Sequence, residues 1–153
     1  LKLRRRKRTP EQACEAMLKH RDSGATVFQG WCLKTCREAW GAPADQPSAI
    51  KEWQSIPKAR QHKFTQAQAP LAAPVFWRGC GPFGHIALQA KHTDRVISTD
   101  APTADKVGVV GRDWFAKHWG ATLLGWSCEL NGVKVIQDCP ICDNVDIADN
   151  SDI

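Results

Sequence analysis

The chain has 153 residues, a formal net charge of +5 at pH 7, and 42% hydrophobic against 24% charged residues, which together are typical of one globular domain. It contains no run of about 18 apolar residues, so a membrane-spanning helix is excluded. No apolar segment follows its basic start, and we therefore expect no signal peptide and synthesis in the cytoplasm.

Charge divides the chain into three parts. Residues 2–8 hold six Lys or Arg, whereas residues 138–153 hold five Asp and neither Lys nor Arg. We therefore expect a basic N-terminal arm at residues 1–8, one domain at 9–137 and an acidic C-terminal tail at 138–153. A basic arm suits an anionic polymer such as nucleic acid, a lipid surface or a cell-wall polymer, or it is a solvated tail.

The seven cysteines favour a reducing compartment without a disulfide framework, because their number is odd and no signal peptide is seen. Cys139 and Cys142 form one C-x-x-C pair, which is half of a structural zinc site. No histidine follows this pair, and no other histidine has a companion at ligand spacing, so we expect no metal.

The first third of the chain is predicted to be helical. Pro10 and the capping-box residue Gln12 open a helix that should end near Gly24. Two more helices and then a polar loop are expected at residues 32–40, 48–54 and 58–73.

Short apolar segments follow and predict strands. These segments are residues 74–77, 85–90, 95–99, 107–110, 123–126 and 133–136. The second and third of them plausibly form a hairpin, and residues 113–119 are a short helix or loop. Helices first and strands afterwards predict an α+β domain with an antiparallel sheet.

Cys32 is the first candidate site residue, because it follows Gly30 and Trp31 at the start of a predicted helix. Free backbone N–H groups and the positive end of the helix dipole stabilise a thiolate there, so we expect a lowered thiol pKa. The same N–H groups can hold the oxyanion of a tetrahedral intermediate. The other interpretation of Cys32 is a small buried thiol. Cys36, one helical turn further on, is a rival nucleophile that we assign to the core.

His85 is the second candidate, because it follows Gly84 at the start of an apolar strand. A histidine on a rigid strand can take the proton of a thiol and later give it to a leaving amine. A buried, hydrogen-bonded core histidine is the other interpretation. Strand alternation places Ser98 and Asp100 on one face of the next strand, and either can orient the imidazole. We choose Asp100, although it can equally be a turn residue.

Two motifs resemble the cysteine, histidine-dependent amidohydrolase/peptidase (CHAP) family and its NlpC-type relatives. Gly30-Trp31-Cys32 matches a G-x-C motif at a helix start, and residues 84–87 match a G-H-[IV]-A motif on a strand. Residues 73–77 resemble the family's G-D-[IV]-x-x-[WF] strand without its aspartate, and residues 124–133 resemble the C-terminal part of small actinobacterial and phage-associated lysins. The resemblance covers roughly residues 10–136 and implies a papain-like fold, with N-terminal helices packed on an antiparallel β-sheet.

The resemblance implies a cysteine hydrolase that cleaves amide bonds of peptidoglycan through a thioacyl intermediate. Either the stem peptide or the N-acetylmuramoyl-L-alanine amide would be cut. Cys32 would be the nucleophile, His85 its base and Asp100 the third residue, with Gln29 and Trp31 as oxyanion or cleft candidates. No cofactor is required, the protein would be a monomer, and it would reach the cell wall as a phage lysin does or remain with a virion.

Three other functions stay open. The first is a nucleic-acid-binding module that uses the basic arm and zinc held at Cys139 and Cys142. The second is a relative without catalytic activity that binds the cell wall or packs in a virion. The third is a papain-like protease or deamidase with a protein substrate.

Overall fold

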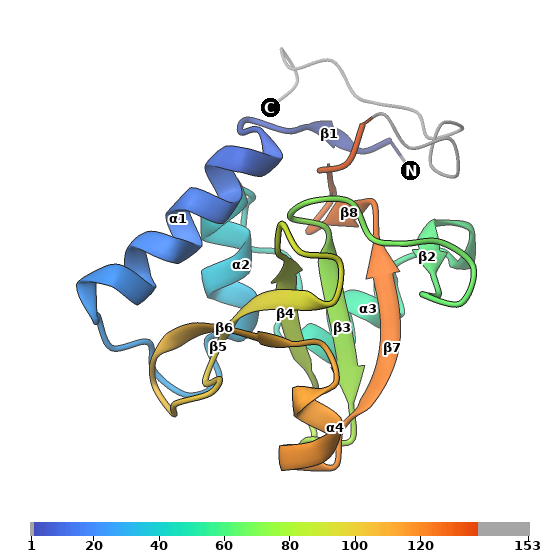
Figure 1. The fold of residues 1–153 in the computed structure, drawn as a ribbon. Helices are drawn as coiled ribbons and strands as arrows, with labels where there is room; N and C mark the ends of the chain where they lie inside the picture. Colours follow the sequence, from blue (N-terminus) through green and yellow to red (C-terminus); the bar gives the residue numbers. More distant parts are fainter. Residues whose placement is uncertain (1, 138–153) are drawn as a thin grey trace.

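The computed structural model describes residues 2–137, in which the three predicted N-terminal helices precede the strands of the main sheet (Figure 1). The first half holds β1 (Arg4–Arg5), α1 (Pro10–Ser23), α2 (Cys32–Trp40), α3 (Ala49–Ser55), a 3-10 turn at Lys58–Arg60 and β2 (Gln61–His62). The second half holds β3 (Pro74–Arg78), β4 (His85–Gln89), β5 (Arg95–Thr99), β6 (Val107–Gly111), α4 (Trp114–Trp119), β7 (Thr122–Ser127), β8 (Glu129–Leu130) and β9 (Val133–Lys134).

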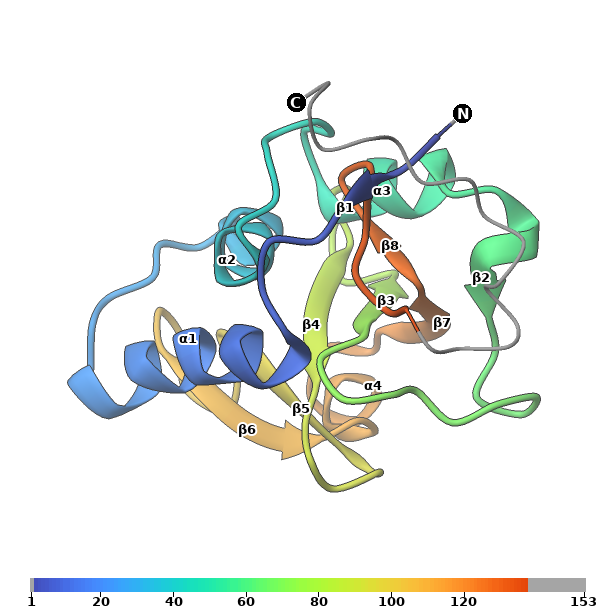
Figure 2. The same ribbon diagram turned by 90° about the horizontal axis from the view of Figure 1, so that it is seen from above.

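The main sheet has six strands in the order β2-β7-β3-β4-β5-β6, and every neighbouring pair is antiparallel. A small second sheet has the order β1-β9-β8. Helices and antiparallel strands together make this an α+β protein, as the sequence predicts. Figure 2 shows α1 and α2 lying side by side next to the strands of the main sheet.

Helix α2 packs against β4 and β5, and α1 packs against β5 and β6. The side of α2 that faces the sheet carries Leu33, Cys36, Ala39 and Trp40, all of which are buried. This three-to-four residue spacing is the apolar stripe of a helix that packs on a core. Helix α3 contacts β3 and β4, and α4 contacts β7.

Local signals in the sequence explain where the first two helices begin and end. Thr9 and Gln12 form the predicted capping box, since each side chain accepts a hydrogen bond from the other residue's backbone N–H. Gly24 and Gly41 end α1 and α2 in the left-handed conformation, with φ of 66° and 68°. These boundaries agree with the predicted ones.

The basic arm packs against the domain and is not a solvated tail. Its strand β1 pairs in parallel with β9, and Leu3 is buried. Arg6 donates a hydrogen bond to the carbonyl of Val135 at 3.0 Å. Arg8 donates to the carbonyls of Glu38 and Ala39 at 2.7 and 2.9 Å, at the negative end of the α2 dipole. The expected acidic tail at residues 138–153 lies outside the described residues.

Tryptophan side chains fill much of the core, as their number in the sequence suggests. Trp40, Trp77 and Trp126 are at most 1% exposed. The indole N–H of Trp40 donates to the carbonyl of Ala72 at 3.1 Å, and that of Trp126 to Ala67 at 3.0 Å, so burial leaves neither donor unpaired. In the part of the chain that the structure describes, no helix combines the length and apolar character needed to cross a bilayer.

Candidate active site

Five separate parts of the chain line a cavity of about 700 Å³. They are the start of α2, the segment that leads into α3, the turn between β3 and β4, and the positions of Asp100 and Trp119. Four of the sequence candidates line this cavity: Gln29, Cys32, His85 and Asp100. The two motifs of the sequence therefore meet at one concave site, although they lie far apart in the chain.

Helix α2 places Cys32 at its first residue. The N-cap residue, Trp31, makes no side-chain hydrogen bond to the first turn. The backbone N–H groups of the first turn therefore have no side-chain acceptor from the N-cap residue, and they point out of the end of the helix where Cys32 lies. Such N–H groups can donate hydrogen bonds to an oxyanion that forms next to the Cys32 sulfur.

Burial controls the acidity of the Cys32 thiol. The side chain is 8% exposed, and burial raises the pKa of the thiol to about 11, against the opposing effect of the backbone N–H groups of Ile86 and Leu33. The expectation of a lowered thiol pKa is therefore wrong for the unliganded site, because loss of hydration outweighs the helix N-terminus. The resting group is a neutral thiol.

Strand β4 begins with His85, whose ring lies among aromatic side chains. Its centroid is 5.0 Å from the rings of both Phe115 and Trp119 and 5.7 Å from that of Trp77. The residue is 4% exposed, and burial lowers the pKa of the imidazole to about 3. His85 is therefore neutral at physiological pH, and three large rings hold its plane.

Ser98 determines which nitrogen of His85 carries the proton. Its Oγ lies 2.7 Å from Nε2 of His85, and the same hydroxyl donates to the carbonyl of Thr99 at 2.8 Å. A hydroxyl has one proton, so Ser98 must accept a hydrogen bond from Nε2–H. The neutral imidazole then carries its lone pair on Nδ1, which is the state that a general base requires.

Asp100, our first choice for the third residue, has a different role. Strand β5 ends at Thr99, and Asp100 takes the left-handed conformation with φ of 59°. Its carboxylate accepts the backbone N–H of Asp105 at 2.7 Å and so closes a turn. Strand alternation stops before Asp100, and the hydrogen-bond partner of His85 is the alternative residue, Ser98. Asp100 still lines the cavity.

One of the two other cleft candidates lines the cavity. This residue is Gln29, whereas Trp31 is not part of the lining and is 40% exposed. The Trp31 ring contacts Phe28 edge-on at 4.9 Å, and the Lys34 ammonium lies 3.9 Å from its centroid. Sequence reasoning missed Trp119, whose ring contacts the imidazole; the aromatic residues four apart in α4 were the available signal.

The other described cysteines differ in their surroundings. Cys36 is fully buried and its thiol donates to the carbonyl of Ile86 at 3.8 Å, which agrees with its assignment to the core. Cys14 is also buried, and Cys80 is a half-buried free thiol that lines the cavity. Cys128 is disulfide-bonded, contrary to our expectation of a chain without disulfides. Cys139 and Cys142 lie outside the described residues.

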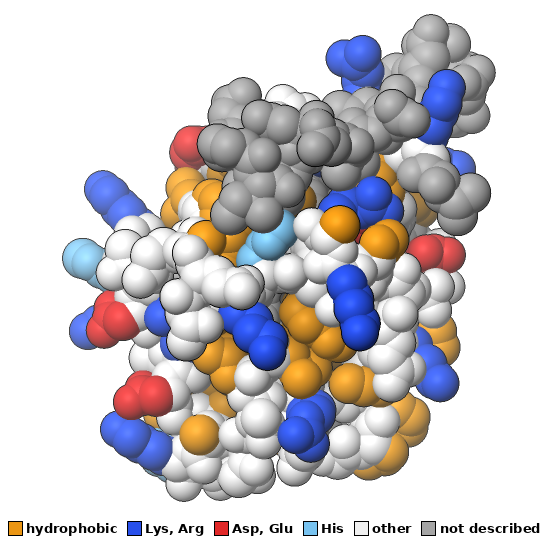
Figure 3. All heavy atoms as spheres, turned by 90° about the vertical axis from the view of Figure 1, so that its right-hand side faces the viewer, with side chains coloured by type: hydrophobic (Ala, Val, Ile, Leu, Met, Phe, Trp, Pro, Cys, Tyr) orange, Lys and Arg blue, Asp and Glu red, His pale blue; other side chains and the backbone are white. Residues whose placement is uncertain are grey.

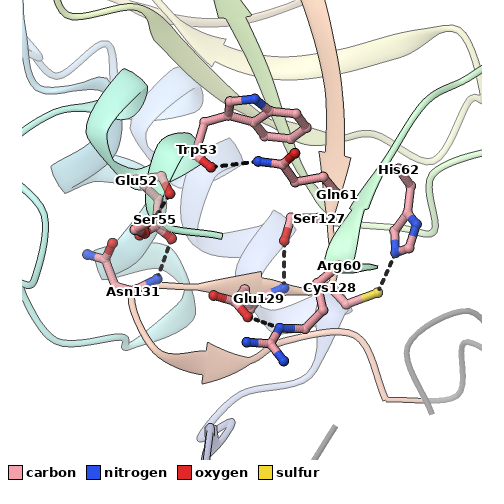
Figure 4. A network of polar contacts seen from close by, with 10 residues as sticks. All are labelled: Glu52, Trp53, Ser55, Arg60, Gln61, His62, Ser127, Cys128, Glu129 and Asn131. Atoms are coloured by element: carbon pink, nitrogen blue, oxygen red, sulfur yellow. Dashed lines mark hydrogen bonds and ion pairs between the residues drawn. The ribbon is translucent and has the colours of Figure 1, made fainter. Parts of the chain in front are cut away.

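A second group of polar side chains connects α3 to the β8–β9 turn (Figure 4). The buried carboxylate of Glu52 accepts the backbone N–H of Asn131 at 2.8 Å and the hydroxyl of Ser55 at 3.2 Å. Arg60 and Glu129 form an ion pair beside it. These residues do not line the 700 Å³ cavity, and we assign them a structural role.

Comparisons with known proteins add no relative: the chain matches no family model, no curated protein and no solved structure. The resemblance to the CHAP family consequently depends on the sequence motifs alone.

Proposed function

We propose that the protein is a papain-like cysteine hydrolase that cuts amide bonds. One observation carries the proposal: Cys32, at the start of α2, and His85, at the start of β4, line the same cavity. In the papain-like arrangement, the helix that carries the nucleophile packs on the strand that carries the base. Helix α2 packs on β4 in this way.

The burial of both groups implies that Cys32 is a neutral thiol and His85 a neutral imidazole in the resting site. As the sulfur of Cys32 attacks the carbonyl carbon, Nδ1 of His85 takes the thiol proton. N–H groups of the first turn of α2 stabilise the oxyanion. The imidazolium then gives the proton to the leaving amine, and a thioester remains on Cys32. Water attacks this thioester with the help of His85, which releases the acid and restores the thiol.

Ser98 is the third residue of this proposed site. Its hydrogen bond fixes the Nε2–H tautomer of His85 and supports the imidazolium once it forms. This assignment replaces Asp100, whose carboxylate is occupied by the turn to Asp105.

Peptidoglycan is the substrate that the CHAP resemblance suggests. The bond would be either an amide of the stem peptide or the amide between N-acetylmuramic acid and L-alanine. The same resemblance suggests action on the cell wall by a phage lysin or a virion-associated protein. A papain-like protease or deamidase with a protein substrate is the alternative within this chemistry.

Hydrolysis of purified peptidoglycan tests the proposal. The parent should release new amino groups, whereas Cys32→Ala and His85→Ala should lower the rate by about 1,000-fold or more, since both act in the chemical step. Cys36→Ala is the matched control, because it removes a thiol from the same helix outside the cavity. A Cys32→Ala variant that keeps the parental rate would rule out the proposed nucleophile.

The arm offers a separate binding surface for an anionic polymer, as the charge distribution suggests. Arg4, Arg5 and Lys7 line a shallow hollow of about 120 Å³ next to the end of α2. Figure 3 shows a face on which Lys and Arg side chains are scattered among apolar and uncharged ones. We propose that the hollow contacts a phosphodiester polymer. Binding should weaken steeply with salt and with Arg4→Ala, and salt-independent binding would contradict this.

A further inference from the structure

Cys80 is a thiol that the proposed mechanism does not use. It lies in the turn between β3 and β4, it is a free cysteine, and it is only half-buried. Cys80 and Cys32 both line the 700 Å³ cavity. The other two free thiols among the described residues, Cys14 and Cys36, are buried outside the cavity and donate to backbone carbonyls at 3.7 and 3.8 Å. The cavity therefore has two thiols, one of which is the proposed nucleophile.

Two glycines flank Cys80 in the turn between β3 and β4. Gly79 and Gly81 flank it with φ of 82° and 114°, values that favour glycine. A Cβ atom at Gly81 would meet nothing within 4 Å, so the turn has open space on that side. Burial raises the pKa of Cys32 most, and a thiolate on Cys80 adds a smaller rise.

We propose that Cys32 and Cys80 form a reversible disulfide across the cavity, which switches the hydrolase off under oxidising conditions. This inference rests on the proposed function, because the switch works by sequestering the proposed nucleophile. Bridging requires Cα atoms within about 7 Å, so the proposal requires the glycine-flanked turn to hold Cys80 at that distance from Cys32 in the oxidised protein. Cys14 and Cys36 cannot substitute for Cys80, since each is held in the core.

A peroxide is the oxidant. The more accessible Cys80 attacks one peroxide oxygen, the O–O bond breaks, and Cys80 becomes a sulfenic acid as the first water leaves. The sulfur of Cys32 then attacks the sulfenic sulfur, the S–O bond breaks, and a second water leaves with the Cys32 proton. Two thiols lose two electrons and two protons, and hydrogen peroxide is reduced to two waters. A dithiol reverses the reaction by thiol–disulfide exchange.

Peptide mapping tests the disulfide without any assay of activity. The reduced full chain is treated with hydrogen peroxide, blocked with N-ethylmaleimide and digested without reductant. A peptide that joins Cys32 to Cys80 should appear, disappear after dithiothreitol, and be absent from Cys80→Ser but present in Cys36→Ala. Oxidised protein in which Cys32 and Cys80 both still react with N-ethylmaleimide, or in which Cys32 is joined to Cys36, would overturn the inference.

Hydrolysis of peptidoglycan by the same samples separates the two proposals. Peroxide should lower the parental rate at least about 10-fold, and dithiothreitol should restore it. The rate of Cys80→Ser should not fall in peroxide relative to its own rate without peroxide, because the variant lacks the thiol that peroxide oxidises first and Cys32 is buried. A disulfide in a protein that never hydrolyses peptidoglycan would overturn the proposed function alone. Hydrolysis that survives peroxide in the parent would overturn the switch alone.

Discussion

Single hydrogen bonds set the chemistry that His85 can perform. Nε2 of the imidazole is committed to Ser98, so only Nδ1 can accept a proton. Strand alternation places Ser98 and Asp100 on one face, and our prediction from the sequence is Asp100, since nothing in the residue pattern shows that the strand ends at Thr99. Asp100 takes a left-handed φ, which ends the strand before it, and no residue pattern in this sequence predicts this conformation.

Removal of the Ser98 hydroxyl should slow the chemical step. Ser98→Ala leaves Nε2–H buried without its acceptor, so we expect kcat to fall about 10- to 100-fold with little change in KM. Steady-state kinetics on a soluble muropeptide measure kcat and KM separately. Asp100→Asn is the control, because its amide oxygen can still accept the N–H of Asp105 and its rate should stay near the parental one. A larger loss in Asp100→Asn than in Ser98→Ala would restore Asp100 as the orienting residue.

The two buried groups predict an unusual dependence on pH. Because burial raises the pKa of Cys32 to about 11, its thiolate fraction should still be rising at pH 10. Because burial lowers the pKa of His85 to about 3, protonation of the imidazole should not reduce activity at pH 5. Site-resolved rates of alkylation by iodoacetamide between pH 6 and 10 follow the thiol. A plateau near pH 7 would contradict this assignment.

At the scale of elements, the sequence predicted the ends of the first two helices but not the shortest strands or their partners. Thr9, Gly24 and Gly41 mark helix ends by their own chemistry, so α1 and α2 follow from the sequence. Strands β1, β2 and β8 have two residues each, which is too few for an alternating pattern. Their pairing depends on partners far away in the chain, as between β1 and β9.

The turn that leads into β4 requires glycine immediately before His85. Gly84 has φ of 69°, and a Cβ atom there would lie 2.9 Å from the carbonyl oxygen of Trp77 and 3.1 Å from Cβ of Ile50. Gly84→Ala should therefore lower the free energy of unfolding by about 2–3 kcal/mol, through strain and overlap together. Urea denaturation measures this change.

Gly120→Ala is the matched control for the turn. Gly120 has φ of 64°, and a Cβ atom there would meet nothing within 4 Å. Only the left-handed backbone is therefore penalised, by about 1 kcal/mol. Equal losses in the two variants would show that the close contacts of Gly84 do not matter.

For the molecule as a whole, buried polar groups connect stability to pH. Glu52 on α3 accepts a hydrogen bond from the β8–β9 turn, and burial raises its pKa from 4.5 to about 7 (Figure 4). Folding therefore favours the protonated carboxyl. This contribution to stability is fully present below about pH 4.5 and is lost as the pH rises through 7.

Glu52→Gln should remove this dependence, since an amide keeps an acceptor for the N–H of Asn131 without a charge. At pH 8 the variant should be more stable than the parent by up to about 3 kcal/mol, and at pH 4 the two should be nearly equal. Urea unfolding at both pH values gives the comparison. A variant that is less stable than the parent at pH 8 would show that the charged carboxylate is needed by the fold.

The fold class and the meeting of two distant motifs were predictable for the whole molecule, because helices preceded strands and both motifs began an element. The docking of the arm was not predictable, since six basic residues in seven suggest a solvated segment. Arg6 instead donates a hydrogen bond to the carbonyl of Val135, next to β9, and Arg8 donates to carbonyls of α2. Whether such a segment packs on the domain therefore depends on its tertiary contacts and not on its composition.

Trapping the acyl group on sulfur tests the central claim most directly. Parent protein mixed with peptidoglycan fragments is quenched in acid within the first turnovers, digested and mapped by mass spectrometry. The account predicts a thioester on Cys32 that hydroxylamine removes and that does not form in His85→Ala. An acyl group on another residue, or turnover of the fragments with Cys32 never acylated, would contradict the account.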